Sequence, residues 1–413
     1  MTDDTLPRPL SGVRVLDLSR ILAGPWCTQL LADMGAEVIK IERPGSGDDT
    51  RSWGPPYLRD AHGQETSEAA YYLACNRGKK SVCIDIAQPE GQQLVRELAA
   101  MSDVVVENYR VGQLAKYGLD YASLSAAHPG LIYCSITGFG QNGPYAARAG
   151  YDYVVQGMSG FMSITGEREG TPGTQPQKAG IAVSDIFTGL YAGLGILGAL
   201  HQRDVSGEGQ YIDLALLDVM VASLANMNLN FLTSGVAPVR AGNAHQNLVP
   251  YQVFDTRDSH VIVAVGNDGQ FRKFCEVAGC PQLADDPRFA TNPQRVRHRD
   301  VLIAQLADIM RGRDKADWIA QLEVAGVPCG PIDTLAEAFD NPQVRARGLR
   351  FDLPHPLAGQ VPMVRSPLVF GTTGLHATTP PPTLGEHTDV VLRTLLGHSD
   401  DEIAALRQRG TVA

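Results

Sequence analysis

The sequence lacks the cysteine patterns that would indicate a metal site or a disulfide framework. Its 413 residues include seven cysteines, an odd number, with no Cys-x-x-Cys pair and no Cys/His spacing typical of metal ligands. Free thiols of this kind are usual in a reducing compartment, so we predict a cytoplasmic protein with no metal site. No motif supports a catalytic cysteine either.

Long hydrophobic runs and an excess of positive charge are also missing. No apolar stretch of about 18 residues is free of polar breaks, and the richest one, 186–200, carries four glycines. We therefore expect no membrane span. The first residues, Met1-Thr-Asp-Asp4, are acidic and do not form a signal-peptide pattern. A net charge of −10 argues against nucleic acid or an anionic membrane as the main partner.

What the chain does have is an alternation of strands and helices typical of an α/β protein. Strands are predicted at 13–18, 36–42, 80–85, 103–108 and 131–136, with helices at 25–35, 89–101 and 111–117. Strand–helix–strand units of this kind build a parallel sheet, so we predict an α/β fold with a Rossmann-like large domain.

The chain is too long for one ordinary core, and its pattern changes after residue 215. We predict that 1–215 forms the first part of the large domain, that 220–329 forms a small α+β domain, and that 330–413 returns to the large domain. The further elements expected are a strand at 211–216, a helix at 218–234, strands at 251–256 and 260–265, helices from 270 to 325, and a final helix at 388–409.

A dinucleotide site of the NAD type is disfavoured at the first turn of the large domain. Glu42 ends the second strand, where an NAD-binding fold places an acidic residue on the ribose. The first turn, however, contains Ala23-Gly24-Pro25 instead of Gly-x-Gly-x-x-Gly, and Pro25 removes an N–H that a pyrophosphate would use. The fold can therefore be Rossmann-like without this cofactor.

Basic residues gather near the ends of the predicted strands. They are Arg20, Lys40, Arg43, Arg77, Lys79, Lys80, Arg110 and Lys116. They could be scattered surface charge, which is the usual role of Lys and Arg. Because loops after the carboxyl ends of parallel strands line the ligand crevice, and because the chain is acidic overall, we favour a role in binding phosphates.

The stretch 180–203 is predicted to be one long helix that is apolar on every side and therefore central to the large domain. Gly189, Gly193 and Gly198 follow one another at roughly helical spacing, which would let another backbone approach. Asp185 interrupts the apolar run near the helix N-terminus, where backbone N–H groups favour an anion. Two interpretations stay open on these residues alone: Ser184 or Asp185 is an N-cap, or Asp185 is a nucleophile, ionised at neutral pH.

Nine segments, taken in order, resemble the class III CoA-transferase family, also called CaiB/BaiF, which includes formyl-CoA transferase, carnitine CoA-transferase and α-methylacyl-CoA racemase. The resemblance covers nearly the whole chain. The segments are Leu10–Asp17 with Ala23–Pro25, Gly35–Asp48, Asn76–Ser81, Asp103–Asn108, Gly150–Asp152, Asp185 within its helix, Ser206–Gln210, Gly326–Pro331 and Leu384–Asp389.

The resemblance implies a homodimer of interlocked chains, with the site at the junction of domains and subunits, and with Asp185 as the nucleophile. Asp185 would attack the thioester of an acyl-CoA, form an acyl-aspartyl anhydride and then an aspartyl-CoA thioester, and pass CoA to a carboxylic acid. CoA is then a substrate, and no tightly bound cofactor is expected. The glycine-bearing loop 242–246 could supply N–H donors to the oxyanions. The residues expected to hold CoA are Ile21, Leu22, Ala23, Arg43, Ile84, Asp85, Ala87, Asn108, Tyr109, Arg110, Lys116, Tyr117 and Tyr151.

Tyr151 separates two chemistries within this family. The racemase resembles this chain but has Gly-His-Asp where this sequence has Gly150-Tyr-Asp152. Racemisation needs a second acid/base group, and Tyr, with an ordinary pKa of about 10, is a poor base at neutral pH. We therefore predict a CoA-transferase over a racemase, with a non-catalytic acyl-CoA-binding protein as a third possibility. Succinyl-CoA and a short dicarboxylate or hydroxy acid are the expected substrates, with Arg51 and His245 as candidates for binding the distal carboxylate.

Overall fold

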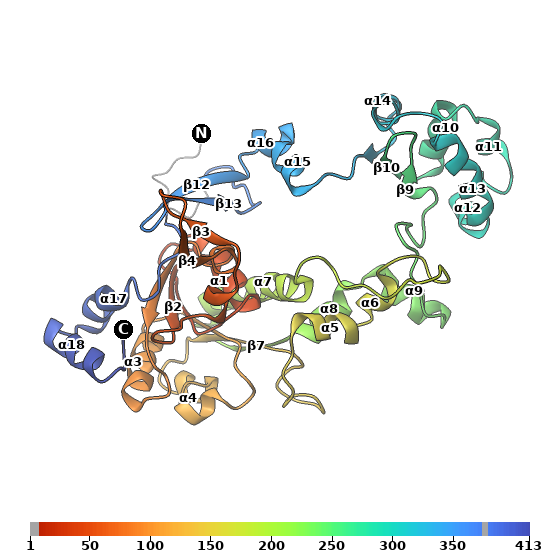
Figure 1. Cartoon of the computed structure of the whole chain (residues 1–413). Coiled ribbons are helices and arrows are strands. Elements are labelled where there is room, and N and C mark those ends of the chain that lie inside the picture. Colours follow the sequence, from red (N-terminus) through yellow and green to blue (C-terminus); the bar gives the residue numbers. More distant parts are fainter. Residues whose placement is uncertain (1–7, 374–378) are drawn as a thin grey trace. The chain divides into compact units, whose positions relative to one another are not determined.

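The computed structural model describes residues 8–373 and 379–413, which form two compact units (Figure 1). The first unit contains the chain up to Phe161, Ala179–Thr233 and Gln343–Ala413, and the second contains Met162–Lys178 and Ser234–Pro342. The acidic start of the chain, Met1–Asp4, lies outside the described residues.

The unit boundaries differ from the predicted domain boundaries in three segments. Residues 220–233 lie with the first unit, since Met220 is buried in the same core as the long helix. Residues 162–178 and 330–342 lie with the second unit. Segment 162–178 is joined to the rest of the second unit by a hydrogen bond from Glu169 N to Arg240 O, at 3.0 Å. Sequence patterns do not reveal such a pairing of distant residues.

The first unit is built on a six-stranded sheet in which every neighbouring pair is parallel. The strands, in spatial order, are β5 (Lys79–Cys83), β2 (Glu37–Glu42), β1 (Arg14–Asp17), β6 (Val104–Glu107), β7 (Ile132–Thr137) and β8 (Tyr211–Ala215). Numbered along the chain, this order is 3-2-1-4-5-6, the order of the Rossmann fold. The predicted fold class and all six predicted strands are therefore confirmed.

Helices cover both faces of this sheet, and each face has its own core. Helices α1 (Ala23–Asp33), α7 (Val183–Ser206) and α8 (Leu216–Ser223) pack on one face. The other face is covered by α3 (Pro89–Ala100), α4 (Tyr121–Ser125), α17 (Thr388–Leu396) and α18 (Asp400–Gln408). Figure 1 shows α17 and α18 on the opposite side of β2 from α1. The strands are apolar on both faces because both are buried.

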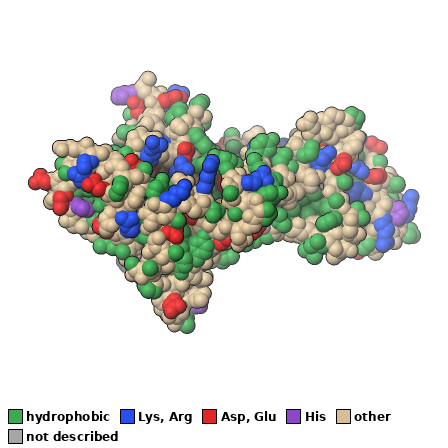
Figure 2. All heavy atoms as spheres, turned by 90° about the horizontal axis from the view of Figure 1, so that it is seen from below, with side chains coloured by type: hydrophobic (Ala, Val, Ile, Leu, Met, Phe, Trp, Pro, Cys, Tyr) green, Lys and Arg blue, Asp and Glu red, His purple; other side chains and the backbone are tan. Residues whose placement is uncertain are grey.

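Helix α7 is the central helix that the sequence predicted, and it packs against α1 and β7. It ends at Gly207, whose φ of 76° is the left-handed conformation that suits a glycine after a helix. Helix α7 is long and apolar enough to meet the length and hydropathy criterion for a membrane span, a criterion that core helices of soluble proteins also meet, and half of its most apolar window is buried. Leu190, Tyr191 and Leu194 of α7 are exposed. Exposed hydrophobic side chains are also plain on the face drawn in Figure 2.

Three predicted helices differ in the structure. The predicted helix 218–234 is two helices, α8 and α9 (Asn226–Ser234), which meet at Ala225 with a φ of 47°. The final helix is likewise divided, since Gly397 takes a φ of 74° after α17. In the predicted helix 111–117, Gly112 has a φ of 75°, and only the 3-10 turn η2 (Leu114–Tyr117) forms after it. In each case a residue with a positive φ interrupts the helical pattern.

The remaining elements of the first unit are short. They are η1 (Asp49–Ser52), β3 (Tyr57–Arg59), β4 (Glu65–Ala69), α2 (Ala70–Leu73), α5 (Asp152–Met158), β12 (Arg350–His355) and β13 (Gly359–Val364), with α6 (Phe161–Ile164) and α16 (Pro342–Ala346) at unit boundaries. All seven cysteines of the chain are free thiols, as expected, and Cys27, Cys75, Cys83 and Cys134 are buried in this unit.

The second unit is a small α+β body with its own core. Its three strands are β9 (Tyr251–Asp255), β10 (His260–Ala264) and β11 (Cys329–Gly330), paired antiparallel in the order β11-β10-β9. Its helices are α10 (Asp268–Val277), α11 (Gln282–Asp285), α12 (Asn292–Arg297), α13 (Arg299–Met310), α14 (Lys315–Ala325) and α15 (Leu335–Asp340). Phe271, Phe274 and Trp318 are fully buried in its core.

Candidate active site

The candidate site lies where the strand order of the sheet reverses, between β1 and β6. Ligands of open α/β sheets bind in the crevice outside the carboxyl ends of the strands at such a point. The loop after β1 and the loop after β6 are joined there: Arg20 N donates to Asn108 Oδ1 at 2.9 Å, and Asn108 Nδ2 donates to Arg20 O at 2.7 Å. The topology therefore brings two of the predicted CoA-binding segments together.

These loops line a cavity of about 220 Å³ that also contains Asp185. The predicted site residues around it are Ile21, Leu22, Ala23, Asn108, Tyr109, Arg110 and Tyr151. A neighbouring cavity of about 410 Å³ is lined by the predicted residues Arg43, Ile84, Asp85, Ala87 and Tyr117. Arg20, Tyr109 and Gln113 line both cavities, so they form adjoining parts of one crevice. Lys116 is exposed and lines neither cavity.

Asp185 is in the first turn of α7, but neither it nor Ser184 is the N-cap. The N-cap residue is Ala182, and the Ser184 N–H donates a hydrogen bond to Asp152 Oδ1. The N-cap interpretation of the sequence is therefore wrong. No described residue donates a hydrogen bond to the Asp185 side chain, which lines the cavity. The carboxyl group is thus half-buried at the cavity wall, without the partners that usually compensate a charge withdrawn from water.

Burial, together with the nearby charge of Asp152, raises the pKa of Asp185 to about 7. Loss of hydration disfavours the carboxylate, and a like charge does the same. The sequence-based expectation was a carboxylate fully ionised at neutral pH. The structure instead indicates that the free protein holds both forms there.

Asp152, which begins α5, holds the first turn of α7 in place. Its Oδ1 accepts from Ser184 N at 2.8 Å and also from Ser184 Oγ, and its Oδ2 accepts from Gln156 Nε2 at 2.6 Å. Asp152 was part of a recognised motif in the sequence, but its role beside Asp185 was not predicted. The sequence signal for this role is the position of Asp152, an acidic residue directly after Tyr151.

Tyr71 is a second residue near Asp185 that the sequence did not reveal. Burial raises the pKa of Tyr71 to about 12, and the charge of Asp185 adds to this effect. Its ring meets the edge of Trp53, with ring centroids 5.1 Å apart. Neither aromatic residue stands in a pattern that distinguishes it from an ordinary core residue, so no sequence signal pointed to them.

The structure corrects the prediction that the basic cluster binds phosphates as a whole. Lys40 pairs with Asp48 at 2.9 Å and Lys79 pairs with Asp17 at 3.1 Å, and all four side chains are fully buried. Two further members are also paired, Arg77 with Asp33 and Lys80 with Glu37. Lys40 and Lys79 belong to buried strands of the sheet, and a lysine is fully buried only where a carboxylate pairs with it. Arg43 and Arg110 line the crevice without an ion pair to any described residue.

Arg51 is also unavailable for a substrate carboxylate. Its guanidinium donates two hydrogen bonds of 2.8 Å to Glu42 and one of 3.2 Å to Glu68, and it stacks on the ring of Tyr72. Glu42 is therefore neutralised by Arg51 inside the fold. The other candidate, His245, belongs to the second unit, where its Nδ1 accepts from Asn247 N at 3.0 Å. The loop 242–246 lies in that unit as well, and its role as an N–H donor stays a prediction.

Comparisons with known proteins show the family to which the chain belongs. A family model described as CoA-transferase family III matches residues 10–388. A protein of Agrobacterium fabrum named succinate–glutarate CoA-transferase is 54% identical over 94% of this chain and 96% of its own. Human succinyl-CoA:glutarate CoA-transferase is 42% identical over 98% of this chain and 90% of its own. The crystal structure of a CaiB/BaiF family protein from Brucella suis is similar with a TM-score of 0.82, at 49% identity over 94% of this chain and all of that one.

Proposed function

Because the chain belongs to CoA-transferase family III and is a CoA-transferase, we propose that it moves CoA from succinyl-CoA to glutarate or a similar short dicarboxylate. The relatives from Agrobacterium fabrum and from human are named for these substrates, which supports the proposal. The observation that carries the proposal is the Asp185 carboxyl group, which lines the crevice at the strand reversal and has no described hydrogen-bond donor.

In the first half of the proposed reaction, an Asp185 oxygen attacks the thioester carbon of succinyl-CoA and the CoA thiolate leaves. The product is a mixed anhydride of succinate and Asp185. The thiolate then attacks the Asp185 carbonyl, succinate leaves with the bridging oxygen, and an aspartyl-CoA thioester remains. Two covalent steps replace one difficult exchange.

In the second half, a carboxylate oxygen of glutarate attacks the aspartyl-CoA thioester and expels the CoA thiolate. The thiolate attacks the glutaryl carbonyl of the new anhydride, which gives glutaryl-CoA and regenerates the Asp185 carboxylate. The bridging oxygen of this second anhydride comes from glutarate and stays on Asp185. Each turnover therefore replaces one oxygen of Asp185 with one from the acceptor.

The oxygen balance provides the test of the proposed function. Succinyl-CoA and glutarate with heavy-oxygen carboxylates should yield glutaryl-CoA, and the peptide that contains Asp185 should gain one heavy oxygen in a single turnover and up to two after many. A panel of other acyl-CoA donors and free acids, assayed by mass for new CoA esters, then defines the substrate range. If no ester forms but the α-proton of an acyl-CoA exchanges with deuterium oxide, the racemase alternative replaces the proposal. Binding of CoA without either reaction would indicate a binding protein.

The pH dependence of the reaction should follow the ionisation of Asp185. Attack requires the carboxylate, so kcat/KM for succinyl-CoA should rise with pH and level off above about 7. Asp152→Asn removes a negative charge that raises the pKa of Asp185, so the inflection should move to lower pH even if the maximal rate falls. The measurement is kcat/KM for succinyl-CoA from pH 5 to about 9 in both proteins.

A matched control identifies the titrating group in this experiment. Asp204→Asn removes an exposed carboxylate from the same helix, about 28 Å along its axis, and should leave the inflection unchanged. Burial also raises the pKa of Glu107 to about 7, but the charge of Asp152 does not act on it. An inflection that stays in place in Asp152→Asn would therefore assign the titration to a group other than Asp185.

We also propose that the protein is a cytoplasmic homodimer. The exposed Leu190, Tyr191 and Leu194 of α7 support this, since exposed apolar side chains on a central helix are the kind of surface that a second chain covers.

A further inference from the structure

The turn between β1 and α1 contains a strained residue, Ile21. Its φ of 71° is in the left-handed region, which a β-branched side chain disfavours strongly. Such a conformation persists only where the surroundings impose it, and it is found mainly at functional sites. Ile21, Leu22 and Ala23 are consecutive residues of the cavity wall beside Asp185. The group that imposes this conformation therefore controls the shape of the site.

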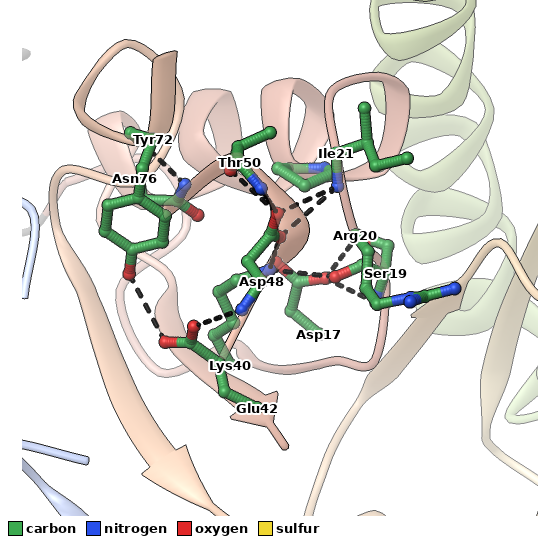
Figure 3. Close-up of polar contacts among 12 residues, drawn as sticks. Asp17, Ser19, Arg20, Ile21, Lys40, Glu42, Asp48, Thr50, Tyr72 and Asn76 are labelled. Atoms are coloured by element: carbon green, nitrogen blue, oxygen red, sulfur yellow. Dashed lines mark hydrogen bonds and ion pairs between the residues drawn. The ribbon is translucent and has the colours of Figure 1, made fainter. Parts of the chain in front are cut away.

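Asp48 lies directly beneath this turn and holds it (Figure 3). Ile21 N donates to both oxygens of Asp48, at 3.3 and 3.2 Å. The Asp48 side chain is fully buried and pairs with Lys40 Nζ at 2.9 Å. Lys40 Nζ also donates to Ser19 O at 2.8 Å. One buried ion pair thus binds the turn at two backbone positions, one on each side of Arg20.

Asp48 is itself fixed by the loop that carries it. Its Oδ1 accepts from Thr50 N at 2.9 Å and from Thr50 Oγ1 at 2.7 Å, and its own N–H donates to Glu42 Oε2 at 2.9 Å. Burial opposes ionisation of Asp48, but the Lys40 charge and the Thr50 hydrogen bonds hold the pKa of Asp48 at about 2. The carboxylate is therefore charged and immobile at any working pH.

The strained turn leads directly into the first turn of α1, which packs closely against α7. A Cβ on Gly24 would lie 2.2 Å from the Ser19 side chain, so the turn folds back tightly on itself. A Cβ on Gly189, one helical turn after Asp185, would lie 2.7 Å from Ala23 O. The end of the strained turn thus meets α7 beside the residue that we assign as the nucleophile.

We propose that Asp48 is a positioning residue for CoA-ester binding, which acts by holding the Ile21 N–H and so keeping residues 21–23 in the conformation that receives CoA. This inference rests on the proposed function only in taking the crevice as the CoA site. The competing possibility is that Asp48 serves only to neutralise Lys40 within the fold.

A double-mutant cycle separates these two roles. Asp48→Glu keeps the charge for Lys40 but displaces the oxygens from Ile21 N by one methylene. Its dissociation constant for CoA, measured by calorimetry, and its KM for succinyl-CoA should each rise about 10-fold to 100-fold. In an Ile21→Gly background, the logarithm of the fold-change that Asp48→Glu causes should be less than about a third of its value in the otherwise wild-type protein. The reason is that glycine adopts the left-handed conformation without the Asp48 hydrogen bonds.

Ala225→Gly is the matched control for this cycle. Ala225 also has a positive φ, 47°, and lies in the same unit between α8 and α9, away from the crevice. In its background, Asp48→Glu should weaken CoA binding in full. If the effect of Asp48→Glu is equally large in the Ile21→Gly background, or if Ala225→Gly reduces it just as much, Asp48 does not act through Ile21 and the proposal is wrong.

The same experiment remains decisive in two less favourable cases. If Asp48→Glu does not fold, Thr50→Val removes a single donor to Asp48 and should weaken CoA binding about threefold, again with loss of the effect in the Ile21→Gly background. If the wild-type protein binds CoA but does not transfer it, the proposed function is refuted. The CoA dissociation constants still decide the role of Asp48.

Discussion

Asp185→Asn is expected to abolish CoA transfer while making the protein more stable. Without the carboxylate no anhydride can form, so kcat should fall by on the order of 10⁴-fold or more, as for other removed nucleophiles. The side chain contributes to the cavity wall but makes no described hydrogen bond, so the dissociation constant for CoA should change by less than about threefold. Transfer is measured by the appearance of glutaryl-CoA, and binding by calorimetry.

The gain in stability follows from the pKa of Asp185, which is about 7 in the folded protein against about 3.9 in an unfolded chain. The folded state therefore binds the Asp185 proton more tightly than the unfolded chain does. Protonation of Asp185 stabilises the folded state fully below about pH 4, and this stabilisation is lost as the pH rises to about 7. Above that pH the ionised carboxylate costs up to about 4 kcal/mol. Asp185→Asn should therefore unfold at a higher temperature than the wild type at pH 8, with the difference vanishing near about pH 4.

Asp204→Asn is the control for both parts of this prediction, because Asp204 is exposed on the same helix. It should change neither transfer nor the pH dependence of unfolding. An Asp185→Asn protein that transfers CoA at near the wild-type rate would contradict the covalent mechanism. One that is less stable than the wild type at pH 8 would contradict the burial of an unpartnered charge.

Gly189→Ala is expected to disrupt the site through packing alone. A Cβ at this position would lie 2.7 Å from Ala23 O and 3.1 Å from Trp26 Cδ1, so α1 and α7 must move apart. Overpacking of this kind costs about 1–3 kcal/mol. Because α1 begins at the cavity wall and Asp185 is one turn before Gly189, the shift should also lower kcat/KM by about 10-fold to 100-fold.

Gly198→Ala provides the comparison within the same helix. A Cβ on Gly198 meets no atom within 4 Å, and alanine is the better helix former by about 1 kcal/mol. Gly198→Ala should therefore raise the unfolding temperature and leave kcat/KM unchanged. Equal stability and activity of the two alanine variants would show that the contact between Ala23 and Gly189 does not set the geometry of the site. Thermal unfolding and steady-state kinetics decide the matter.

The sequence predicted those features that depend on local pattern. Strands β1, β2, β5, β6, β7 and β8 were predictable because short apolar segments alternate with helical ones, and α7 because its run of apolar residues is long. The carboxyl ends of β1 and β6 then bring Arg20–Ala23 and Asn108–Arg110 together by topology. Of the three glycines of α7 predicted to allow close approach, only Gly189 has a backbone atom within 3 Å of its Cβ position.

The sequence could not predict which charged residues are free, because pairing joins segments that are far apart. Lys40, Arg43 and Arg51 are all basic residues in the same part of the sequence, and nothing in the sequence distinguishes them. In the structure, Lys40 is neutralised by Asp48 and Arg51 by Glu42. The break between α8 and α9 was missed for a related reason. Ala225 is a good helix former, and its left-handed conformation is imposed by the surrounding structure.

The burial of the cysteines has a consequence for the proposed mechanism, in which CoA is released as a free thiolate during turnover. Burial raises the pKa of Cys75, Cys83 and Cys134 to about 12 and holds that of Cys27 well above its usual value, so thiolates of these residues are scarce at neutral pH. Cys75 lies next to the crevice, with Sγ 3.6 Å from Ile21 O. The sulfur nucleophile that reacts in the crevice is thus the one that the substrate brings. Mixed disulfides between the first unit and CoA should not accumulate under mild oxidation.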